Sequence, residues 1–366
     1  MSTAFNRRTS GGADLSLLRA GSVGGLKPRS NLTRETQLSL QLRSAIYGTG
    51  CYVPERVLDN AELERMVETD DQWIVERTGI SERRIAAPDE TTSTMAITAG
   101  RQACADAGLD PAELDLIIVA TITPDHLTPA SSCLVQQALG AKRAAAFDLS
   151  AACTGFLYAS TVATGMITSG MYERVLVIGS ETLSRFTDYT DRNTCILFGD
   201  GAGAAVFGPR RDGTGILYTK IYADGEYADL LRIYGGGSKQ PPSLASLAAR
   251  DHYLHVAGRQ VFKFATNVFV QMIEEALDAC GMTQDDVALV IPHQVNARII
   301  DAAVRRLGLP TEKCFINIDR YGNTSSASVP IALDEARRQG KLNPGDVAIL
   351  LGFGSGLTWG ATVLKM

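Results

Sequence analysis

The 366-residue chain lacks the features that mark membrane proteins and nucleic-acid-binding proteins. Its longest apolar runs, at 287–292 and 347–352, are far shorter than the roughly 20 residues that a helix needs to cross a bilayer. It also lacks a sustained run of Lys or Arg, and its 40 acidic residues outnumber 35 basic ones, for a net charge of -5. This balance argues against a polyanion as the main ligand. We therefore expect no membrane span and no nucleic-acid partner.

Motifs for metal binding and for disulfides are scarce as well. The seven cysteines are scattered along the chain without a CxxC pair, which is typical of a reducing compartment such as the cytoplasm. Only four histidines are present, and His252 and His255 form an HxxH pair without a third ligand nearby in the sequence. We interpret that pair as part of a loop, and we expect no metal site.

The first 43 residues differ in composition from the rest of the chain. They hold seven Arg or Lys against two acids, Asp14 and Glu35, and they show no apolar periodicity. This composition fits a disordered N-terminal extension, and it also fits a transit peptide that would direct the protein to a plastid instead of the cytoplasm. We expect the folded chain to begin near Ser44.

From Ser44 onward, short apolar strands alternate with helices, which indicates a layered α/β fold. Strands are expected over 116–120, 145–149, 175–179, 287–291, 314–318 and 347–352. The segment 105–118 resembles 278–291 at a shift of 173 residues, and the same shift aligns 175–179 with 348–352. The repeat predicts two halves of one architecture, over 44–214 and 215–366.

Cys153 lies where a strand ends and a helix begins, a position at which the helix N-terminus favours thiolate and lowers the thiol pKa. With a gap of three residues, the repeat places Asn323 at the start of the corresponding helix of the second half. His293 directly follows another strand of that half. Taken singly, a cysteine or a histidine here is more often a structural residue than a catalytic one. Because strand ends of such sheets share one edge, the three together predict a nucleophilic site built from both halves.

Six segments occur in the order found in one enzyme family. They are DQWIVERTGI at 71–80, AAC at 151–153, FGDGAG at 198–203, PHQVN at 292–296, YGNTS at 321–325 and GFGSGLTWG at 352–360. In these segments the chain resembles β-ketoacyl-acyl-carrier-protein synthase III. The resemblance implies a thiolase-like duplicated fold of five layers, α/β/α/β/α. It also implies a homodimer and an acyltransferase that needs no bound cofactor.

The resemblance further implies the reaction, a decarboxylative Claisen condensation that starts fatty-acid synthesis. An acyl-CoA primer and malonyl-acyl-carrier protein would give 3-oxoacyl-acyl-carrier protein, CoA and CO2. Cys153 would carry the primer acyl group, and His293 and Asn323 would donate hydrogen bonds to the malonyl thioester carbonyl. The backbone N–H groups of Cys153 and Ser355 would bind the oxyanion formed at the acyl-cysteine.

Binding residues also follow from the resemblance. Coenzyme A would contact Trp73, Arg77, Arg192 and Asn296, with the aromatic ring and a guanidinium stacking on the adenine. Acidic acyl-carrier protein would contact Lys263, Arg298, Arg305 and Arg306, of which the last three share one face of a helix over 296–307. Each of these basic residues fits a merely solvated surface equally well.

Thr128 stands where some acetyl-preferring relatives have Phe at the bottom of the acyl pocket, a position contributed across the dimer. Its smaller side chain predicts a deeper pocket that accepts branched or longer primers.

Three other functions use the same residue types. An acyltransferase or condensing enzyme of secondary metabolism would use the same Cys-His-Asn site, and release of CO2 marks the condensing reaction. A papain-like hydrolase also uses these residues, but its fold lacks the repeat, and its Asn orients the His. A catalytically dead acyl-binding relative is disfavoured because all three residues are present.

Overall fold

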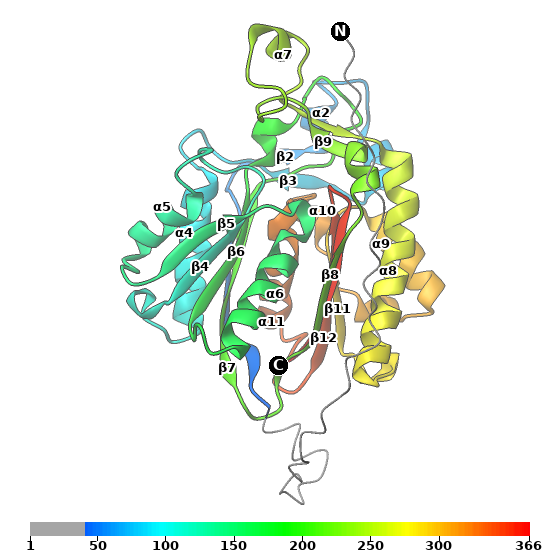
Figure 1. The fold of residues 1–366 in the computed structure, drawn as a ribbon. Helices are drawn as coiled ribbons and strands as arrows, with labels where there is room; N and C mark the ends of the chain where they lie inside the picture. Colours follow the sequence, from blue (N-terminus) through cyan, green and yellow to red (C-terminus); the bar gives the residue numbers. More distant parts are fainter. Residues whose placement is uncertain (1–40) are drawn as a thin grey trace, which may run out of the picture.

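The computed structural model describes residues 41–366 (Figure 1). The extension predicted over 1–43 lies almost wholly outside this range. The first strand of the fold, β1, begins at Arg43.

The first sheet has five strands in the order β1-β7-β6-β4-β5. Their bounds are β1 Arg43–Tyr52, β4 Leu116–Ala120, β5 Ala145–Leu149, β6 Val175–Glu181 and β7 Gly201–Arg210. The central strand β4 is parallel to β5 and β6, whereas β7 is antiparallel to β6 and to β1. All five residues of β4 are buried and apolar, as expected for a strand that helices cover on both faces.

The second sheet repeats this arrangement in the order β11-β12-β13-β8. Its strands are β8 Gly215–Ala223, β11 Leu289–Pro292, β12 Val347–Gly354 and β13 Thr358–Lys365. β11 is parallel to β12, and β13 is antiparallel to β12 and to β8, as β4, β6, β7 and β1 are in the first sheet.

The strand predicted over 314–318 is wrong, because only Cys314 forms a bridge, to Val290. The reason is a side chain that takes over the backbone partners. Gln294 donates from Nε2 to the Phe315 carbonyl at 3.1 Å and accepts the Asn317 N–H at 3.0 Å. These bonds use backbone groups that a further strand would pair, and the chain then turns into the short helix α10, Ile318–Tyr321.

Helices form three layers around the two sheets. α6, Gly155–Thr168, and α11, Ser328–Arg338, lie between the sheets and share one apolar core with both (Figure 1). α4, Thr92–Asp106, and α5, Ser131–Leu139, cover the outer face of the first sheet. α8, Gly258–Cys280, and α9, Ala297–Leu307, cover the second. The predicted five-layered α/β/α/β/α fold is confirmed.

Smaller elements lie at the end of the sheets that carries the site. They are β2 Val57–Asp59, α2 Asn60–Leu63, α3 Asp71–Thr78, β3 Glu82–Arg84, β9 Leu231–Ile233, α7 Leu244–Ala248 and β10 Leu254–Val256. β9 and β10 form a two-stranded ribbon, and α7 lies in the loop that joins them (Figure 1). Among residues 41–366, no helix is both long and apolar enough to span a membrane.

The two central helices begin in the same way. A 3-10 turn precedes each one, η2 Ala152–Thr154 before α6 and η7 Ser325–Ala327 before α11. Ala152 and Ser325 both have positive φ, at 47° and 49°. These two positions differ by 173 residues, so the repeat needs no gap here. Cys153 therefore corresponds to Ser326, and the predicted pairing of Cys153 with Asn323 across a gap of three is wrong.

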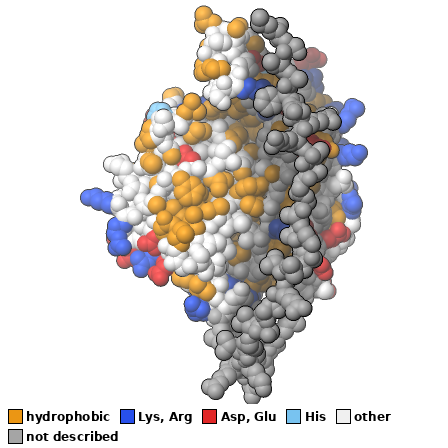
Figure 2. Space-filling view, viewed as in Figure 1, with side chains coloured by type: hydrophobic (Ala, Val, Ile, Leu, Met, Phe, Trp, Pro, Cys, Tyr) orange, Lys and Arg blue, Asp and Glu red, His pale blue; other side chains and the backbone are white. Residues whose placement is uncertain are grey.

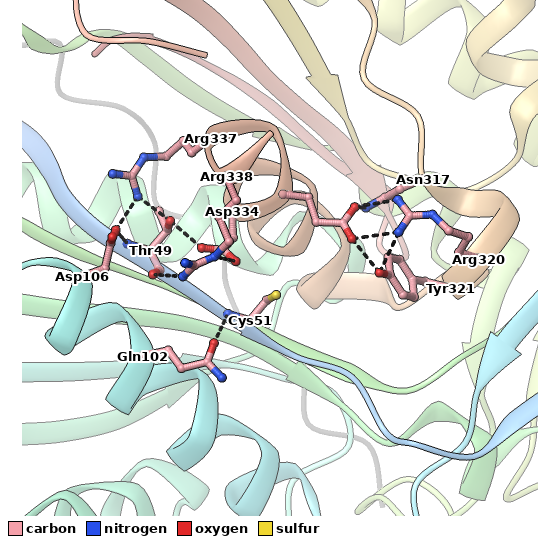
Figure 3. Close-up of polar contacts among 11 residues, drawn as sticks. Thr49, Cys51, Gln102, Asp106, Asn317, Arg320, Tyr321, Asp334, Arg337 and Arg338 are labelled. Carbon is pink, nitrogen blue, oxygen red and sulfur yellow. Dashed lines mark hydrogen bonds and ion pairs between the residues drawn. The ribbon is translucent and has the colours of Figure 1, made fainter. Parts of the chain in front are cut away.

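Polar contacts fasten α11 to the first half of the chain (Figure 3). Asp334, which is fully buried, accepts from Thr49 Oγ1 at 2.7 Å and from Arg338 Nε at 2.8 Å. Arg337 reaches Asp106 of α4, with Nη1 at 2.7 Å from Oδ2, and the same carboxylate accepts the Thr49 N–H. Because removing one partner of a buried pair leaves the other unsatisfied, this network holds the two halves in one relative position.

Candidate active site

Cys153, His293 and Asn323 line one small cavity of about 50 Å³. Cys153 comes from η2, His293 follows β11, and Asn323 precedes η7, so both halves contribute. The other lining residues are apolar, with Phe198 and Phe353 among them. The structure thus brings the three predicted residues to one place.

A second, wider cavity of about 390 Å³ opens on the other side of Cys153. Its walls are mainly aliphatic and aromatic, and they include Ile122, Leu183, Phe198 and Leu254. Such a lining suits an apolar chain and offers few groups to hold a charge. Cys153 therefore lines both the wider apolar cavity and the small cavity that holds His293 and Asn323.

Burial raises the pKa of the Cys153 thiol to about 12, the nearby Ser325 hydroxyl lowers it, and the charge of Glu181 raises it. The predicted net lowering of this pKa is therefore wrong. The backbone N–H at the helix start does lower the pKa, but Cys153 is 7% exposed, and the loss of hydration of the thiolate has the larger effect. At neutral pH the free site holds a thiol.

His293 is held as a neutral donor. Its ring is 1% exposed, and burial lowers its pKa to about 3. The Ser328 hydroxyl accepts the Gln294 N–H at 3.4 Å and lies 2.6 Å from His293 Nδ1, to which it can donate. With Ser328 as the donor to Nδ1, the ring proton is on Nε2, which is buried without a partner in the described part of the chain. Nε2–H is therefore available to a ligand in the cavity.

Hydrogen bonds to the side-chain oxygen and to the backbone hold Asn323 in one orientation. Oδ1 accepts the Ser325 N–H at 2.8 Å, and the backbone of Asn323 bonds Leu197 and Gly199 on either side. With Oδ1 engaged, the Nδ2 group is the part of the side chain that can serve a ligand as donor. Two donors, from His293 and Asn323, thus face the chamber next to the thiol.

The end of β12 passes close to the nucleophile, and position 354 must be glycine. A Cβ on Gly354 would lie 2.8 Å from the Cys153 nitrogen, which is backbone and cannot give way. Ser355, the predicted second oxyanion donor, follows directly and lines the wider cavity. Its hydroxyl donates to the Leu231 carbonyl of β9, so the side chain points to the ribbon and leaves the backbone near the site.

The residues predicted for coenzyme A gather where α3 meets α9. The Trp73 ring lies between two guanidinium groups, with Arg77 Cζ 4.5 Å and Arg192 Cζ 4.4 Å from its centroid. Asn296 caps α9 by accepting the Arg298 N–H and donates from Nδ2 to the Arg77 carbonyl at 2.9 Å. Asn296 therefore positions this corner of the fold, whatever else it binds.

The residues predicted for the carrier protein are exposed on α8 and α9, which lie side by side (Figure 1). Arg306 is partly engaged, since it donates from Nη1 to Asn267 Oδ1 at 2.8 Å. The others are Lys263, Arg298 and Arg305. Thr128 lies exposed in a loop and lines neither cavity of this chain.

Sequence reasoning missed four residues around the thiol: Glu181, Ser325, Ser328 and Phe353. The run from Asn323 to Ser328 carries five polar side chains that are all buried, and Glu181 ends a strand that begins with four apolar residues. A polar run or an acid that directly continues an apolar strand was the available signal.

Comparisons with known proteins agree with this geometry. Residues 147–225 match the family profile of 3-oxoacyl-[acyl-carrier-protein] synthase III, and residues 277–366 match the profile of its C-terminal part. The chain is 54% identical over 320 residues to a beta-ketoacyl-[acyl-carrier-protein] synthase III of Desulfitobacterium hafniense, covering 87% of this chain and 97% of the relative. It is 50% identical to the one of Caldanaerobacter subterraneus, covering 89% and 98%.

Solved structures give the same answer. The crystal structure of 3-oxoacyl-[acyl-carrier-protein] synthase III from Aquifex aeolicus has a TM-score of 0.82 at 47% identity, covering 88% of this chain and all of that one. The priming β-ketosynthase of the R1128 polyketide pathway also has a TM-score of 0.82, at 39% identity, covering 88% and 95%. The chain belongs to the 3-oxoacyl-[acyl-carrier-protein] synthase III family of condensing acyltransferases.

Proposed function

We propose that this protein starts fatty-acid synthesis by condensing an acyl-CoA primer with malonyl-acyl-carrier protein at Cys153. The observation that carries the proposal is the pair of donors, His293 Nε2–H and the Asn323 amide, that share one chamber with a buried cysteine. In the first step the cysteine sulfur attacks the primer thioester, CoA leaves, and the acyl group becomes a thioester on Cys153. The wider apolar cavity accommodates its chain.

In the second step the malonyl group enters the small chamber. Its thioester oxygen accepts hydrogen bonds from His293 and Asn323, and these strengthen as CO2 leaves and the oxygen becomes enolate-like. The enolate carbon then attacks the acyl-cysteine carbonyl, whose oxygen receives the backbone N–H groups of Cys153 and Ser355. The carbon–sulfur bond breaks, 3-oxoacyl-acyl-carrier protein departs, and the Cys153 thiolate regains a proton.

The direct test supplies purified protein with acetyl-CoA and malonyl-acyl-carrier protein. We expect CO2 and 3-oxoacyl-acyl-carrier protein in equal amounts, measured by trapped radiolabel and by mass spectrometry. Acyl transfer without CO2 would contradict the condensing reaction.

Likeness to the R1128 priming ketosynthase supports a second candidate, a condensing enzyme of secondary metabolism with the same site. Comparing turnover with a fatty-acid carrier protein and a polyketide carrier protein separates the two. A strong preference for the polyketide carrier would favour the second candidate.

The two substrates should depend on different surfaces. Arg192→Ala removes one guanidinium from the Trp73 stack, and we expect about a fivefold higher KM for acyl-CoA, since a stacked cation contributes roughly 1 kcal/mol. Arg298→Glu reverses a charge on α9, and we expect a higher KM for the acidic carrier protein. Added salt should reduce the difference in KM between this variant and wild type. Each variant is the control for the other, because each KM effect should fall on one substrate. Equal effects of both variants on both substrates would contradict the assignment.

We propose a homodimer that joins two copies along β5. This edge strand has no partner on its outer side in the described chain, and its last four residues are half-buried. Figure 2 shows hydrophobic side chains gathered on the face where β5 and α6 lie, and Phe147, Leu149, Val162 and Met166 are partly buried there. We expect the mass of a dimer by light scattering, and a monomer for Phe147→Asp. A monomeric wild type would contradict the proposal.

The role of Thr128 across that dimer, the absence of a bound cofactor and the cytoplasmic location stay predictions. Turnover of branched and four- to eight-carbon acyl-CoA above that of acetyl-CoA is the expected result for Thr128.

A further inference from the structure

Glu181 is a fully buried carboxylate next to the nucleophile, and the two proposed steps give it no part. It ends β6 of the first half and reaches across to η7 of the second. Within residues 41–366, hydrogen bonds stabilise the negative charge of Glu181, and no cation is paired with it. An acid kept in such a place without an ion pair is costly, because burial disfavours its charged form and raises its pKa.

The two oxygens of Glu181 have different surroundings. Oε2 accepts three donors from the end of β4: the Ile122 N–H at 3.1 Å and the hydroxyls of Thr121 and Thr123 at 3.1 and 2.7 Å. These donors hold Oε2 as an acceptor in either protonation state.

Oε1 faces two serine hydroxyls, Ser325 at 3.1 Å and Ser326 at 2.9 Å. Ser326 also lies 2.8 Å from the Ala120 carbonyl. Ser326 can thus donate to that carbonyl instead of to Glu181, and a protonated Oε1 can donate to the oxygen of Ser325. The site can therefore hold Glu181 both as a carboxylate and as an acid.

Ser325 connects this carboxylate to the reacting sulfur. Ser325 and Cys153 line the same cavity, the Ser325 side chain lowers the pKa of the Cys153 thiol, and the Ser325 hydroxyl donates to Glu181 Oε1 at 3.1 Å. The backbone N–H of Ser325 fixes Asn323 at the same time. Ser325 adopts a positive φ of 49°, which is uncommon for a residue other than glycine and directs the side chain between the two groups.

We propose that Ser325 and Glu181 form a proton relay that accepts the Cys153 thiol proton when the cysteine is acylated. The S–H bond breaks as Ser325 Oγ takes the proton, and the proton of Ser325 moves to Glu181 Oε1. The sulfur then attacks the thioester carbonyl, and the carbon–sulfur bond to CoA breaks. The proton returns along the same path to the departing CoA sulfur, so the step neither gains nor loses a proton. The inference rests on the proposed acylation of Cys153.

Charge explains why such a relay suits this site. A thiol beside a carboxylate and a thiolate beside a carboxylic acid both carry one negative charge, so the transfer adds no second charge to a buried site. Burial raises the pKa of both groups, which brings the base nearer in strength to the thiol it must deprotonate. The neutral His293 has Nδ1 engaged by Ser328 and serves as a donor, so it does not compete for this proton.

The groups that face Glu181 come from the end of β4, from η7 and from η2, and Cys153 is the titratable member of this set.

The test measures the single-turnover rate of acyl transfer from acetyl-CoA to Cys153 by rapid quench and mass spectrometry, from pH 5.5 to 10. For wild type we expect the rate to fall at acid pH, because Glu181 must be ionised to accept the proton. For Glu181→Gln we expect a rate about 10²- to 10⁴-fold lower at pH 7. It should also rise about tenfold per pH unit, as direct ionisation of the thiol takes over.

Ser325→Ala and Ser326→Ala form a matched pair that does not depend on the folding of the Glu181 variant. Each removes one hydroxyl from the same carboxylate oxygen, but of the two serines Ser325 is the one that lines the cavity with Cys153 and acts on the thiol pKa. We expect at least a tenfold slower acylation for Ser325→Ala and a rate within about threefold of wild type for Ser326→Ala.

Equal rates for the two serine variants, or a Glu181→Gln variant with the wild-type rate and pH profile, would overturn the relay while leaving acylation of Cys153 intact. A wild type that takes up no acyl group would refute the proposed function itself, and the relay with it.

Discussion

Cys153→Ala is expected to take up no acyl group from acetyl-CoA, whereas wild type gains one acetyl mass per chain. The thiol lies at the junction of the two cavities, and no other cysteine lines either of them. Without a covalent intermediate the two-step route is closed, so condensation should fall by at least about 10⁴-fold. Intact-mass spectrometry after incubation, followed by peptide mapping, measures the first effect, and release of CO2 measures the second.

Cys104→Ala is the matched control for this experiment. Both thiols are buried, and burial raises the pKa of Cys104 to about 11, but Cys104 packs in the core between α4 and the first sheet, away from both cavities. We expect this variant to be acylated like wild type. Persistent labelling of Cys153→Ala would move the nucleophile to another residue and would contradict the central assignment.

The thiol also shows what the sequence could and could not predict. The position of Cys153 at a strand end, the 173-residue repeat and the family segments predicted the fold and brought three residues together correctly. The direction of the thiol pKa was wrong, because desolvation depends on what the rest of the fold places around the sulfur. A dipole at a helix start can be seen in a sequence, but the neighbouring carboxylate of Glu181 cannot.

Side-chain hydrogen bonds and backbone conformation explain the other differences between the sequence predictions and the structure. The strand predicted over 314–318 failed because the side chain of Gln294, which lies 21 and 23 residues earlier, bonds to the backbone of Phe315 and Asn317. The roles of Ser325 and Ser328 depend on the directions of their side chains, and at Ser325 this direction follows from a positive φ. Such features are fixed by tertiary contacts and leave no periodicity in the sequence.

His293→Ala should separate the two half-reactions. We expect it to be acylated at nearly the wild-type rate, because the ring serves the malonyl thioester and has no part in removing the thiol proton. Condensation from enzyme that is already acylated should fall by about 10²- to 10³-fold, the usual effect of losing one donor to a developing oxyanion. His255→Ala, which changes an exposed histidine of β10, is the control and should keep both rates.

The pH dependence of the same measurement checks the protonation state of the ring. Burial lowers the pKa of His293 to about 3, so the ring stays neutral, with its proton on Nε2, throughout the range above pH 5. Condensation from acylated enzyme should therefore show no loss of rate near pH 6.5, where an ordinary histidine would gain its second proton.

If His293→Ala instead lost acylation and condensation equally, the ring would have to act as the base for the thiol. That role needs an acceptor nitrogen facing Cys153, whereas the Ser328 hydroxyl occupies Nδ1 and leaves Nε2 as a donor. Such a result would also make the path from Cys153 through Ser325 to Glu181 unnecessary. The two predictions thus constrain each other: a donor at His293 requires that another group remove the thiol proton, and Glu181 is the buried carboxylate that the fold connects to it.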